Sequence, residues 1–252
     1  MQSPVKAIIL SAGQGKRLSP LTDTRPKCLV DLSGRSVLEW QIRHLHAAGV
    51  TEVVVVTGFA ADLVEAELAR LRLPGLTLRT IFNPFYSVSD NLASVWMARG
   101  EMQGSFLLLN GDTLFEPAIA QRLLSAPSAP ITVTIDRKDG YDSDDMKVRT
   151  EGDALREIGK TITTYDAESI GFLRFEPEGA ALFTDIVERS LRTPEGLRRW
   201  YLSAIDQIAR AHDAVAVRSI QGLDWAEMDF PEDLPRNREL AANWTAAEAT
   251  PA

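Results

Sequence analysis

The chain has 252 residues, of which 45% are hydrophobic and 25% are charged, so it can bury a core as one large α/β domain. Its net charge of −8 excludes a general nucleic-acid-binding surface, because nonspecific affinity for phosphates comes from clustered Lys and Arg. The single cysteine, Cys28, excludes a disulfide within the chain. No apolar run reaches the roughly 18 residues that span a bilayer, so a membrane helix is not expected. Both features predict a cytoplasmic protein.

Strand and helix patterns alternate in the first half of the chain. We expect a buried strand at Lys6–Leu10, a helix at 36–48 and a buried strand at Glu52–Thr57. The alternation continues with helix, strand, helix and strand at residues 60–72, 76–82, 91–102 and 106–109. This pattern predicts a Rossmann-like, doubly wound, mostly parallel sheet with its active groups at the carboxyl ends of the strands. The order of the strands is not visible in the sequence.

Shorter strands are expected after Asp112, at residues 131–136, 147–150, 154–158 and 169–175. We interpret the segment from about 131 to 175 as a small substrate-binding lobe inserted into a single domain of residues 1–252. Helical patterns return at 177–191 and 201–211, followed by a strand at 214–217 and a last helix from 231 to about 243. We expect the tail, residues 244–252, to be frayed.

The loop after the first strand, in 7-AIILSAGQGKRLSPLTDTRPKCLVDLSG-34, combines glycines with cationic side chains. The GQG turn at 13–15 lets backbone N–H groups approach an anion, and Arg17 and Lys27 supply positive charge. Leu18 stands where the dinucleotide fingerprint needs its third glycine, and Leu10 stands where a P-loop needs its first. The loop therefore has the parts of an anion site without the spacing of either common motif.

This run resembles the signature of the nucleotidyltransferases that make NDP-sugars and CDP-alcohols. The matching positions are Ser11-Ala12-Gly13, Gly15, Arg17-Leu18, Pro20-Leu21-Thr22, Pro26-Lys27 and Leu38-Glu39. The resemblance continues through 48-AGVTEVVVVTGF-59, 110-NGDTLF-115 and 224-DWAEMDFPEDL-234, and so covers nearly the entire chain. Ser11 is one departure, because the family usually has Ala or Gly there. The resemblance implies the nucleotidyltransferase, GT-A-like form of the doubly wound fold.

The resemblance also implies roles for charged residues. Arg17 would bind the β- and γ-phosphates that leave as pyrophosphate, and Lys27 would contact the α-phosphate. Asp112 and Asp229 would hold Mg²⁺, an ion that takes one or two carboxylates together with phosphate oxygens. For Asp229, capping of the last helix is the alternative. Two acidic residues close to it in the sequence do not match the motif position, namely Asp224 and Glu227.

The implied nucleotide site also includes 83-NPFYSVSDNLASVWMA-98, which lacks the Gln-rich pattern of glucose-1-phosphate thymidylyltransferases. Its Asn-x-x-Ser, from Asn91 to Ser94, is similar to that of bacterial cell-surface phosphocholine cytidylyltransferases. This favours CTP, because Asn and Ser can pair with cytosine. Capping of a helix by residues 89–91 is the alternative. The residues implied to bind nucleotide are Ser11, Ala12, Gly13, Gly15, Ser89, Asn91, Ser94 and Gly111.

A second segment, 136-DRKDGYDSDDMKVRT-150, is similar to the same cytidylyltransferases. The resemblance implies that Lys147 reaches the phosphates of the bound substrates; a solvated hairpin is the alternative. Glu168 matches a substrate-contacting carboxylate of relatives. Tyr141 and Trp225 are our preferred aromatic contacts for the ammonium group of an amino-alcohol phosphate.

The predicted reaction is Mg²⁺-dependent nucleotidyl transfer. An oxygen of a small phosphate or phosphonate acceptor, such as phosphocholine, attacks the α-phosphorus of CTP or another NTP, and pyrophosphate leaves. Two alternatives stay open, a sugar-1-phosphate nucleotidyltransferase that makes an NDP-sugar and a non-catalytic homologue that binds nucleotide. We expect no nucleic-acid or membrane partner and no catalytic histidine. The exact acceptor and the oligomeric state are open.

Overall fold

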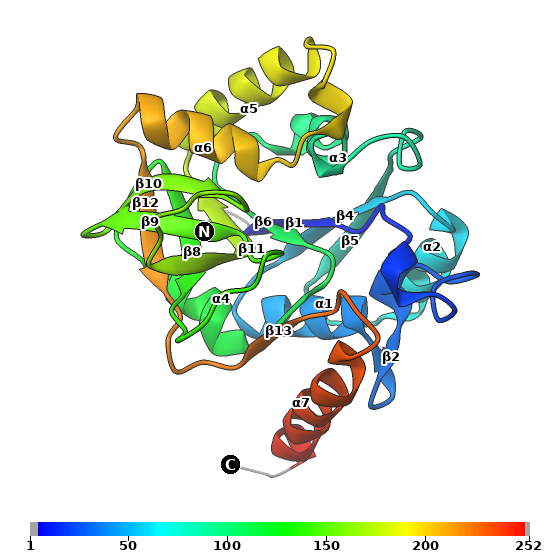
Figure 1. Cartoon of the computed structure of the whole chain (residues 1–252). Coiled ribbons are helices and arrows are strands. Elements are labelled where there is room, and N and C mark those ends of the chain that lie inside the picture. The colour runs from blue at the N-terminus through cyan, green and yellow to red at the C-terminus, as the bar shows by residue number, and fades with distance from the viewer. Residues whose placement is uncertain (1–4, 250–252) are drawn as a thin grey trace.

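The computed structural model describes residues 5–249, which form a nine-stranded sheet with helices on both faces (Figure 1). The strand order is β5-β4-β1-β6-β11-β8-β12-β10-β9. One half is parallel and consists of β5 (Thr77–Phe82), β4 (Glu52–Thr57), β1 (Lys6–Leu10) and β6 (Phe106–Asn110). The mixed half consists of β11 (Ala167–Phe175), β8 (Ile131–Asp136), β12 (Val215–Ser219), β10 (Ala154–Gly159) and β9 (Lys147–Glu151).

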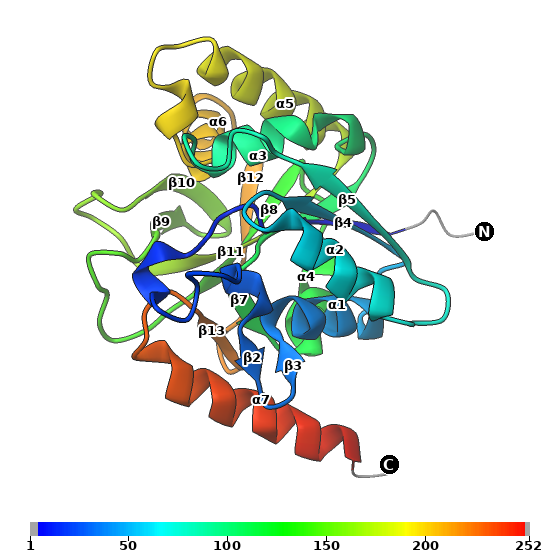
Figure 2. The same cartoon turned by 90° about the vertical axis from the view of Figure 1, so that its right-hand side faces the viewer.

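Side chains of the central strands alternate between two layers of helices. On β1, Ala7 and Ile9 belong to the core under α1 (Val37–Ala47), α2 (Ala61–Arg70) and α4 (Pro117–Leu124). Ile8 and Leu10 belong to the core under α3 (Asn91–Met97), α5 (Pro177–Leu191) and α6 (Leu202–Ala211). Figure 2 shows α3, α5 and α6 above the sheet and α1 and α4 below it. The doubly wound fold class predicted from the sequence is confirmed.

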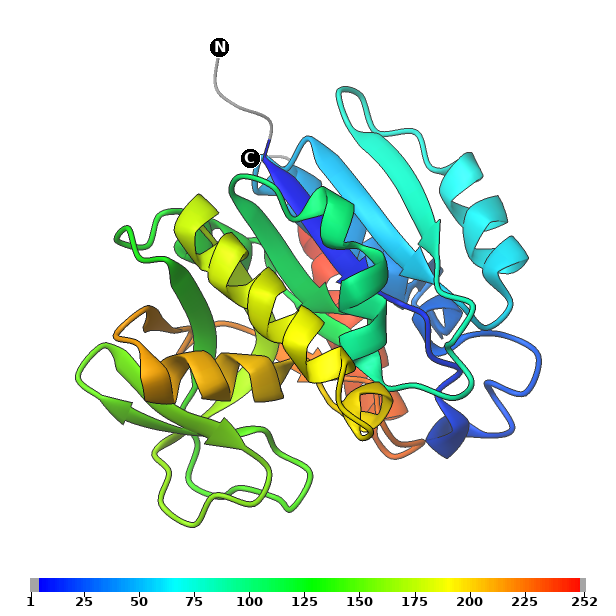
Figure 3. The same cartoon turned by 90° about the horizontal axis from the view of Figure 1, so that it is seen from above.

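The strand order changes direction at β1. The chain adds β4 and β5 on one side of β1 and then β6 on the other side. The four parallel strands run side by side in Figure 3, so their carboxyl ends lie at one edge of the sheet. The loops that leave β1 and β6 diverge there and form the crevice in which open α/β sheets bind ligands.

The segment from 131 to 175, for which we expected a small lobe, continues the main sheet. β8 and β11 lie inside the strand order, whereas β10 and β9 lie at its edge. Glu168 of β11 is opposite Asp136 of β8 and Lys147 of β9. The 137–146 loop, which joins β8 to β9, therefore begins and ends beside Glu168. A role of this segment in acceptor binding stays a prediction.

Two short antiparallel pairs and one helix were not expected from the sequence. They are β2 (Asp31–Leu32) with β3 (Arg35–Ser36), β7 (Thr113–Phe115) with β13 (Trp225–Glu227), and α4. Strands of two or three residues are too short to show a periodicity. The β7–β13 pair matters most, because it joins the segment after β6 to the segment before the last helix.

The last helix, α7 (Asp233–Ala249), is longer than expected. The tail from residue 244, which we expected to be frayed, is helical to Ala249, and that prediction is wrong for these residues; residues 250–252 lie outside the described part. Trp244 explains the difference, because its ring centroid lies 5.6 Å from that of Trp40 and 4.7 Å from that of His44. No helix among residues 5–249 is long and apolar enough to cross a bilayer.

Candidate active site

The loop after β1 is held against Lys27. The N–H of Lys27 donates to the carbonyl oxygen of Gln14 over 3.1 Å. Gly15 has φ +79°, and a Cβ atom at this position would lie 2.7 Å from the Cβ of Lys27. Only glycine combines this left-handed backbone with so close an approach. Gly15 therefore fixes where the lysine side chain leaves the loop.

Lys27 joins the two carboxylates that we expected to hold a metal ion. Its Nζ donates to Oδ2 of Asp112 and, over 2.8 Å, to Oδ1 of Asp229. Burial alone would lower the pKa of Lys27, but the two carboxylates outweigh burial and raise it. Burial likewise opposes ionisation of Asp229, but Lys27 and Arg17 hold the pKa of Asp229 below its ordinary value. Lys27 and Asp229 are therefore both charged at neutral pH.

The β7–β13 pair explains how residues far apart in the sequence meet here. Asp112 directly precedes β7, and Asp229 follows β13 by two residues. Thr113 and Glu227 are opposite each other in the antiparallel register, and the N–H of Met228 donates to the carbonyl oxygen of Asp112 over 3.1 Å. This register places the two aspartates on either side of the Lys27 ammonium group.

A third carboxyl group, Glu227, faces the same place. Burial raises the pKa of Glu227 well above its ordinary value, and the negative charges of Asp112 and Asp229 add to this shift. The sequence contains a signal for this placement, because only the buried Met228 separates Glu227 from Asp229. In an extended segment, side chains two residues apart point to the same side of the backbone, so Glu227 is expected to point the same way as Asp229.

Arg17 pairs with one of these carboxylates, Asp229, and with a further aspartate, Asp144. Its Nη2 lies 2.9 Å from Oδ2 of Asp229, its Nη1 pairs with Asp144, and its guanidinium group lies 4.6 Å from the ring centroid of Phe230. Burial opposes the charge of Arg17, but Asp229 and Asp144 outweigh it and raise the pKa. The charge of Arg17 is thus balanced by two separate aspartates.

Lys160 is a cation of the site that the sequence did not reveal. Its Nζ lies 3.2 Å from Oδ1 of Asp144 and 4.7 Å from the ring centroid of Trp200. The hydrogen bond from Lys160, together with that from Arg17, lowers the pKa of Asp144. Lys160 is the single cation in the stretch 157-EIGKTI-162, so no cluster of positive charge marks it in the sequence.

Three adjoining cavities surround these groups. The loop cavity, of about 250 Å³, has Ser11, Ser94 and Asn110 in its wall, and the acidic cavity, of about 520 Å³, has Glu168 and Trp225 in its wall. The bridging cavity, of about 150 Å³, shares Lys27 and Asp112 with the loop cavity and shares Glu227 and Asp229 with the acidic cavity. The charged cluster around Lys27 thus stands between two larger spaces, an arrangement suited to joining two ligands.

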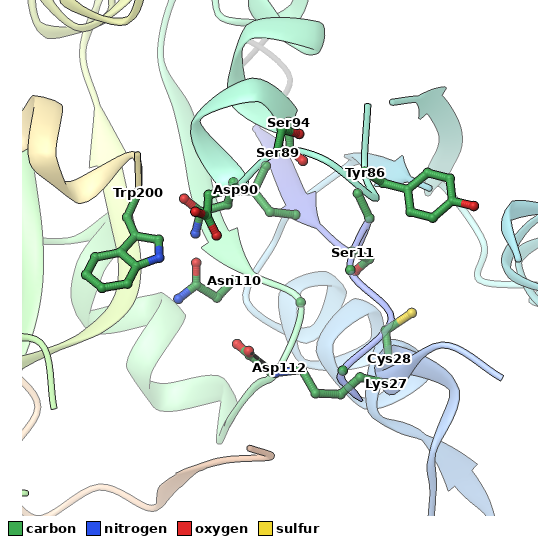
Figure 4. A pocket seen from close by; sticks show the side chains of 16 residues that line it. Ser11, Lys27, Cys28, Tyr86, Ser89, Asp90, Ser94, Asn110, Asp112 and Trp200 are labelled. Atoms are coloured by element: carbon green, nitrogen blue, oxygen red, sulfur yellow. Dashed lines mark hydrogen bonds and ion pairs between the residues drawn. The ribbon is translucent and has the colours of Figure 1, made fainter. Parts of the chain in front are cut away.

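Every residue that we assigned to nucleotide binding lines the loop cavity (Figure 4). Gly111, at the end of β6, approaches the loop after β1 so closely that a Cβ atom would lie 2.3 Å from Oγ of Ser11. The two loops therefore form one continuous wall. The assigned residues are Ser11, Ala12, Gly13, Gly15, Ser89, Asn91, Ser94 and Gly111.

The alternative that residues 89–91 cap a helix is wrong. Asp90 stands at the N-cap position of α3, but its side chain makes no capping hydrogen bond. The Ser89 hydroxyl donates to the carbonyl oxygen of Phe85 over 2.7 Å, and Oδ1 of Asn91 accepts from the N–H of Tyr201 over 2.8 Å. Asp90 instead lines the loop cavity, which the sequence analysis did not predict.

The alternative that Asp229 caps the last helix is also wrong. α7 begins at Asp233, and Oδ2 of Asp233 accepts from the N–H groups of Asp229 and Phe230 over 2.8 and 2.7 Å. Asp233 therefore orders the turn before α7, and the Asp229 carboxylate points to Lys27 and Arg17.

Lys147, for which we expected a contact with phosphates, binds backbone instead. Its Nζ donates to the carbonyl oxygens of Asp142 and Lys160 and lies 5.6 Å from the ring centroid of Tyr165. These contacts tie the end of the 137–146 loop to β10. Lys160, and not Lys147, is in the wall of the bridging cavity. A catalytic role of Lys147 stays a prediction.

The residues expected to contact the acceptor fall into two groups. Glu168 and Trp225 line the acidic cavity, and the indole Nε1–H of Trp225 donates to Oδ2 of Asp136 over 2.8 Å. Burial raises the pKa of Glu168 to about 7, although an ion pair with Lys138 opposes this shift. Tyr141 is not in the wall of this cavity, and its ring centroid lies 5.6 Å from Nζ of Lys138.

The residues around Lys27 fit a Mg²⁺ ion that also binds phosphate. Oδ1 of Asp112 is buried and has no hydrogen-bond partner in the described part of the chain. The ammonium group between Asp112 and Asp229 shows that their arrangement suits a cation. Within residues 5–249, no group of three or more His, Cys, Asp or Glu side chains forms a metal site by itself. Mg²⁺ would therefore complete its coordination with phosphate oxygens and water, as it commonly does.

The histidines make structural contacts. Nδ1 of His44 lies 2.6 Å from the carbonyl oxygen of Phe115, and burial lowers the pKa of His44. Nε2 of His46 lies 3.1 Å from the carbonyl oxygen of Pro74. None of the three histidines is in the wall of the loop, acidic or bridging cavity.

The chain is similar to nucleotidyltransferases both in sequence and in structure. The model of the MobA-like NTP transferase domain matches residues 7–220. The chain is 34% identical to CMP-5'-(3-aminopropyl)phosphonate synthase of Streptomyces rubellomurinus over 91% of this chain and 38% of that protein. It is 25% identical to CTP:phosphoglutamine cytidylyltransferase of Campylobacter jejuni over 91% of this chain and 98% of that protein. The structure of the inositol-1-phosphate CTP transferase from T. maritima matches all of both chains with a TM-score of 0.82 at 22% identity.

The share of each relative that is matched varies. The chain spans 38% of the Streptomyces protein and about half, 51–53%, of three further relatives. The likeness to the T. maritima structure, at 22% identity, shows the shared fold.

Proposed function

The chain belongs to the MobA-like NTP transferase family, and we propose that it is a Mg²⁺-dependent cytidylyltransferase. It joins CTP to a small phosphate or phosphonate that carries an ammonium group, either quaternary, as in phosphocholine, or primary, as in an aminoalkylphosphonate, and releases pyrophosphate. Relatives named for a CMP-phosphonate and for CTP-dependent transfer to phosphoglutamine support this choice.

The observation that carries the proposal is the position of Lys27. Its ammonium group is shared by Asp112 and Asp229 at the carboxyl ends of β1 and β6, between the loop cavity and the acidic cavity. Joining two phosphate-bearing substrates requires that mutually repelling anions be held in line at one cationic point. Lys27 and the metal carboxylates provide that point.

The chemistry needs no protein nucleophile. A deprotonated oxygen of the acceptor forms a bond to the α-phosphorus of CTP while the bond to the pyrophosphate oxygen breaks. Lys27 holds the α-phosphate, and Arg17 holds the β- and γ-phosphates that leave. When held by Asp112 and Asp229, Mg²⁺ supplies charge neutralisation and a template for the phosphate oxygens. For Lys147 we propose a supporting role, since it ties the 137–146 loop in place.

Asp90, Asn91 and Ser94 support cytosine as the base. All three line the loop cavity, and Asp90 and Ser94 lie at its end away from Lys27 in Figure 4. A carboxylate such as that of Asp90 accepts a hydrogen bond from the N4 amine of cytosine and repels the O4 carbonyl of uracil. Asn and Ser side chains can pair with the remaining polar atoms of the base.

The acidic cavity supports a cationic acceptor. Eight acidic residues are in its wall against two basic ones, Lys138 and Arg236. Such a wall attracts an ammonium group, for which the uncharged ring of a sugar-1-phosphate has no counterpart. We therefore propose that Glu168 and Trp225 contact the acceptor and that residues 131–175 supply most of its site. The acidic residues are Asp136, Asp142, Asp144, Asp145, Glu168, Glu227, Asp229 and Asp233.

Two further parts of the proposal concern turnover and location. A non-catalytic homologue would not need to keep both phosphate cations and both metal carboxylates in contact, as this chain does.

We propose a cytoplasmic location, since the single cysteine of the chain, Cys28, is free and buried, as is common in a reducing compartment.

The test is a pyrophosphate-release screen of CTP, UTP, dTTP and ATP against four acceptors with Mg²⁺. The acceptors are phosphocholine, phosphoethanolamine, 2-aminoethylphosphonate and glucose-1-phosphate. We expect turnover with CTP and at least one amine-bearing acceptor, and none with glucose-1-phosphate. Turnover that is best with UTP or dTTP and glucose-1-phosphate, and absent with CTP and every amine, would contradict the proposal in favour of the sugar-nucleotide alternative.

A further inference from the structure

We propose that Lys138 occupies the ammonium site of the acceptor, so that a primary amine of the acceptor must displace its Nζ to bind. The inference rests on the proposed cytidylyltransferase function. It adds a residue that determines specificity, and it narrows the acceptor to phosphates or phosphonates with a primary, rather than a quaternary, ammonium group.

Nζ of Lys138 forms ion pairs with two carboxylates, and Oε1 of Glu168 is buried without a hydrogen-bond partner among the described residues. Nζ lies 2.9 Å from Oδ2 of Asp145 and 2.9 Å from Oε1 of Glu168. Oδ2 of Asp145 also accepts from the N–H of Asp142 over 2.7 Å, so its orientation is fixed by the loop itself. The Asp145 carboxylate is thus held in place, and the buried Oε1 of Glu168 still lacks an N–H donor in the described structure.

The lysine is the partner that can leave. The side chain of Glu168 is 4% exposed, whereas that of Lys138 is 36% exposed and comes from the 137–146 loop. Partly exposed ion pairs contribute little net stability, because water and salt compensate for their loss. An acceptor that is also held through its phosphate can therefore compete with Lys138 for the two carboxylates.

The position of this ammonium site matches the proposed reaction. Lys138, Asp145 and Glu168 line the acidic cavity, and Asp229 and Glu227 line the same cavity. A ligand bound to the two carboxylates can thus extend within one cavity to the cluster around Lys27.

The surroundings favour a primary amine over a trimethylated one. The two carboxylate oxygens, each at hydrogen-bonding distance from one nitrogen, need N–H donors, which a quaternary ammonium lacks. Binding of a quaternary ammonium relies on an aromatic cage instead. Tyr141 is outside the cavity wall. Trp225 and Phe230 are in the wall, but the guanidinium group of Arg17 already faces the ring of Phe230, which leaves Trp225 as the single free aromatic face among the lining residues. The arrangement therefore favours a primary ammonium group over the quaternary one of phosphocholine.

The test compares KM values for 2-aminoethylphosphonate and ethylphosphonate, two acceptors that differ only in the amine. Pyrophosphate release is measured at saturating CTP and Mg²⁺ for the wild-type enzyme and for Lys138→Met, which keeps the apolar stem and removes the ammonium group. Arg137→Met is the matched control, because Arg137 is the adjacent cation, pairs with Asp166 and is not in the wall of the acidic cavity.

We expect Lys138→Met to lower the KM for 2-aminoethylphosphonate about tenfold. This value assumes that the Lys138 ammonium group occupies the site about nine-tenths of the time, so that about one-tenth of the wild-type enzyme is free to bind the amine. The KM for ethylphosphonate should not fall, and kcat and the KM for CTP should stay within twofold. Arg137→Met should leave both acceptor KM values unchanged. An unchanged or raised KM for 2-aminoethylphosphonate in Lys138→Met, or an equal fall with ethylphosphonate or in Arg137→Met, overturns the inference.

The wild-type enzyme provides a second test that does not depend on the folding of a variant. Its kcat/KM for 2-aminoethylphosphonate should exceed that for the N-trimethylated compound by at least about tenfold. Equal or reversed values overturn the inference. If the wild-type enzyme turns over no amine with CTP, the proposed function fails and the inference fails with it. Normal turnover with a KM that does not respond to Lys138→Met overturns the inference alone.

Discussion

Asp112 keeps one buried oxygen, Oδ1, without a hydrogen-bond partner in the described structure, while its Oδ2 accepts from Lys27. A buried carboxylate oxygen is costly to leave unpaired, and the cost falls when a cation approaches it. The proposal that Lys27 turns to the α-phosphate when substrates bind therefore implies another cation at Asp112 and Asp229.

Replacement of either aspartate by asparagine tests this requirement. Asp112→Asn or Asp229→Asn should lower kcat at saturating CTP by on the order of a hundredfold or more, because each removes an anionic ligand of Mg²⁺. Steady-state pyrophosphate release with Mg²⁺ as the only divalent ion measures the effect, and circular dichroism checks the fold. Asp224→Asn, an exposed aspartate of the same segment, is the control and should have near-normal activity. Near-normal activity of Asp112→Asn would exclude Asp112 as a metal ligand.

The raised pKa of Glu168, about 7, predicts a pH dependence of amine binding. Burial is the main cause, and the charges near it are Lys138 and Asp145 of the loop, Glu227 of β13, and Asp136 and Lys147 opposite it in the sheet. The folded protein therefore holds more protons than the unfolded chain between about pH 4.3 and 7. In this window Glu168 loses part of its contribution to stability as the pH rises. Its carboxylate becomes able to bind an ammonium group over the same range.

We therefore expect the KM ratio of 2-aminoethylphosphonate to ethylphosphonate to fall at least about fivefold between pH 6 and pH 8, since the ionised fraction of Glu168 rises through its pKa. Each KM is expressed as the concentration of the phosphonate dianion, because the ammonium group lowers the second pKa of 2-aminoethylphosphonate below that of ethylphosphonate. Glu168→Gln cannot titrate and should give a ratio that does not change with pH. A flat profile in the wild-type enzyme, or an unchanged slope in Glu168→Gln, would show that Glu168 does not bind the amine.

The last helix, α7, is anchored to the rest of the fold mainly by one side chain, Trp244. The helix rests on β2 and the start of α1 through Trp244, whose ring contacts Trp40 and His44. Arg35 adds an ion pair to Glu248 over 2.7 Å and lies 4.5 Å from the ring centroid of Trp40. These contacts extend the helix beyond the point where its sequence becomes rich in Ala and Thr.

Trp244→Ala should lower the free energy of unfolding by about 2 kcal/mol, because a half-buried indole loses its contacts with two aromatic rings. Urea denaturation followed by circular dichroism measures this change. Asn243→Ala, at the adjacent exposed position of the same helix, should change the stability by no more than about 0.5 kcal/mol. Equal stability of the two variants would mean that the docking of α7 does not stabilise the protein.

At the scale of the whole molecule, the strand order places the site. β1 lies between β4 and β6, so the crevice opens at the loop that carries Lys27 and at the turn that carries Asp112. The mixed half of the sheet adds the acidic cavity beside it, with the 137–146 loop at its wall. The two proposed substrate sites thus come from different halves of one sheet and adjoin the cluster around Lys27, which suits a reaction that joins two substrates.

The fold class, the central strands and the eight residues assigned to nucleotide binding, all of which line the loop cavity, could be predicted from the sequence. Alternating runs such as VVVV at 53–56 bury both faces of a strand, and the glycines and cations after β1 form a local motif, so both signals lie within short stretches. Features that depend on pairing between distant segments could not be predicted and are seen only in the folded structure. The strand order, the β7–β13 register that brings Glu227 to Asp112, and the placement of Lys160 and Lys138 have no local signal. Short strands and single lysines carry no periodicity, and their positions follow only from which segments the whole fold places side by side.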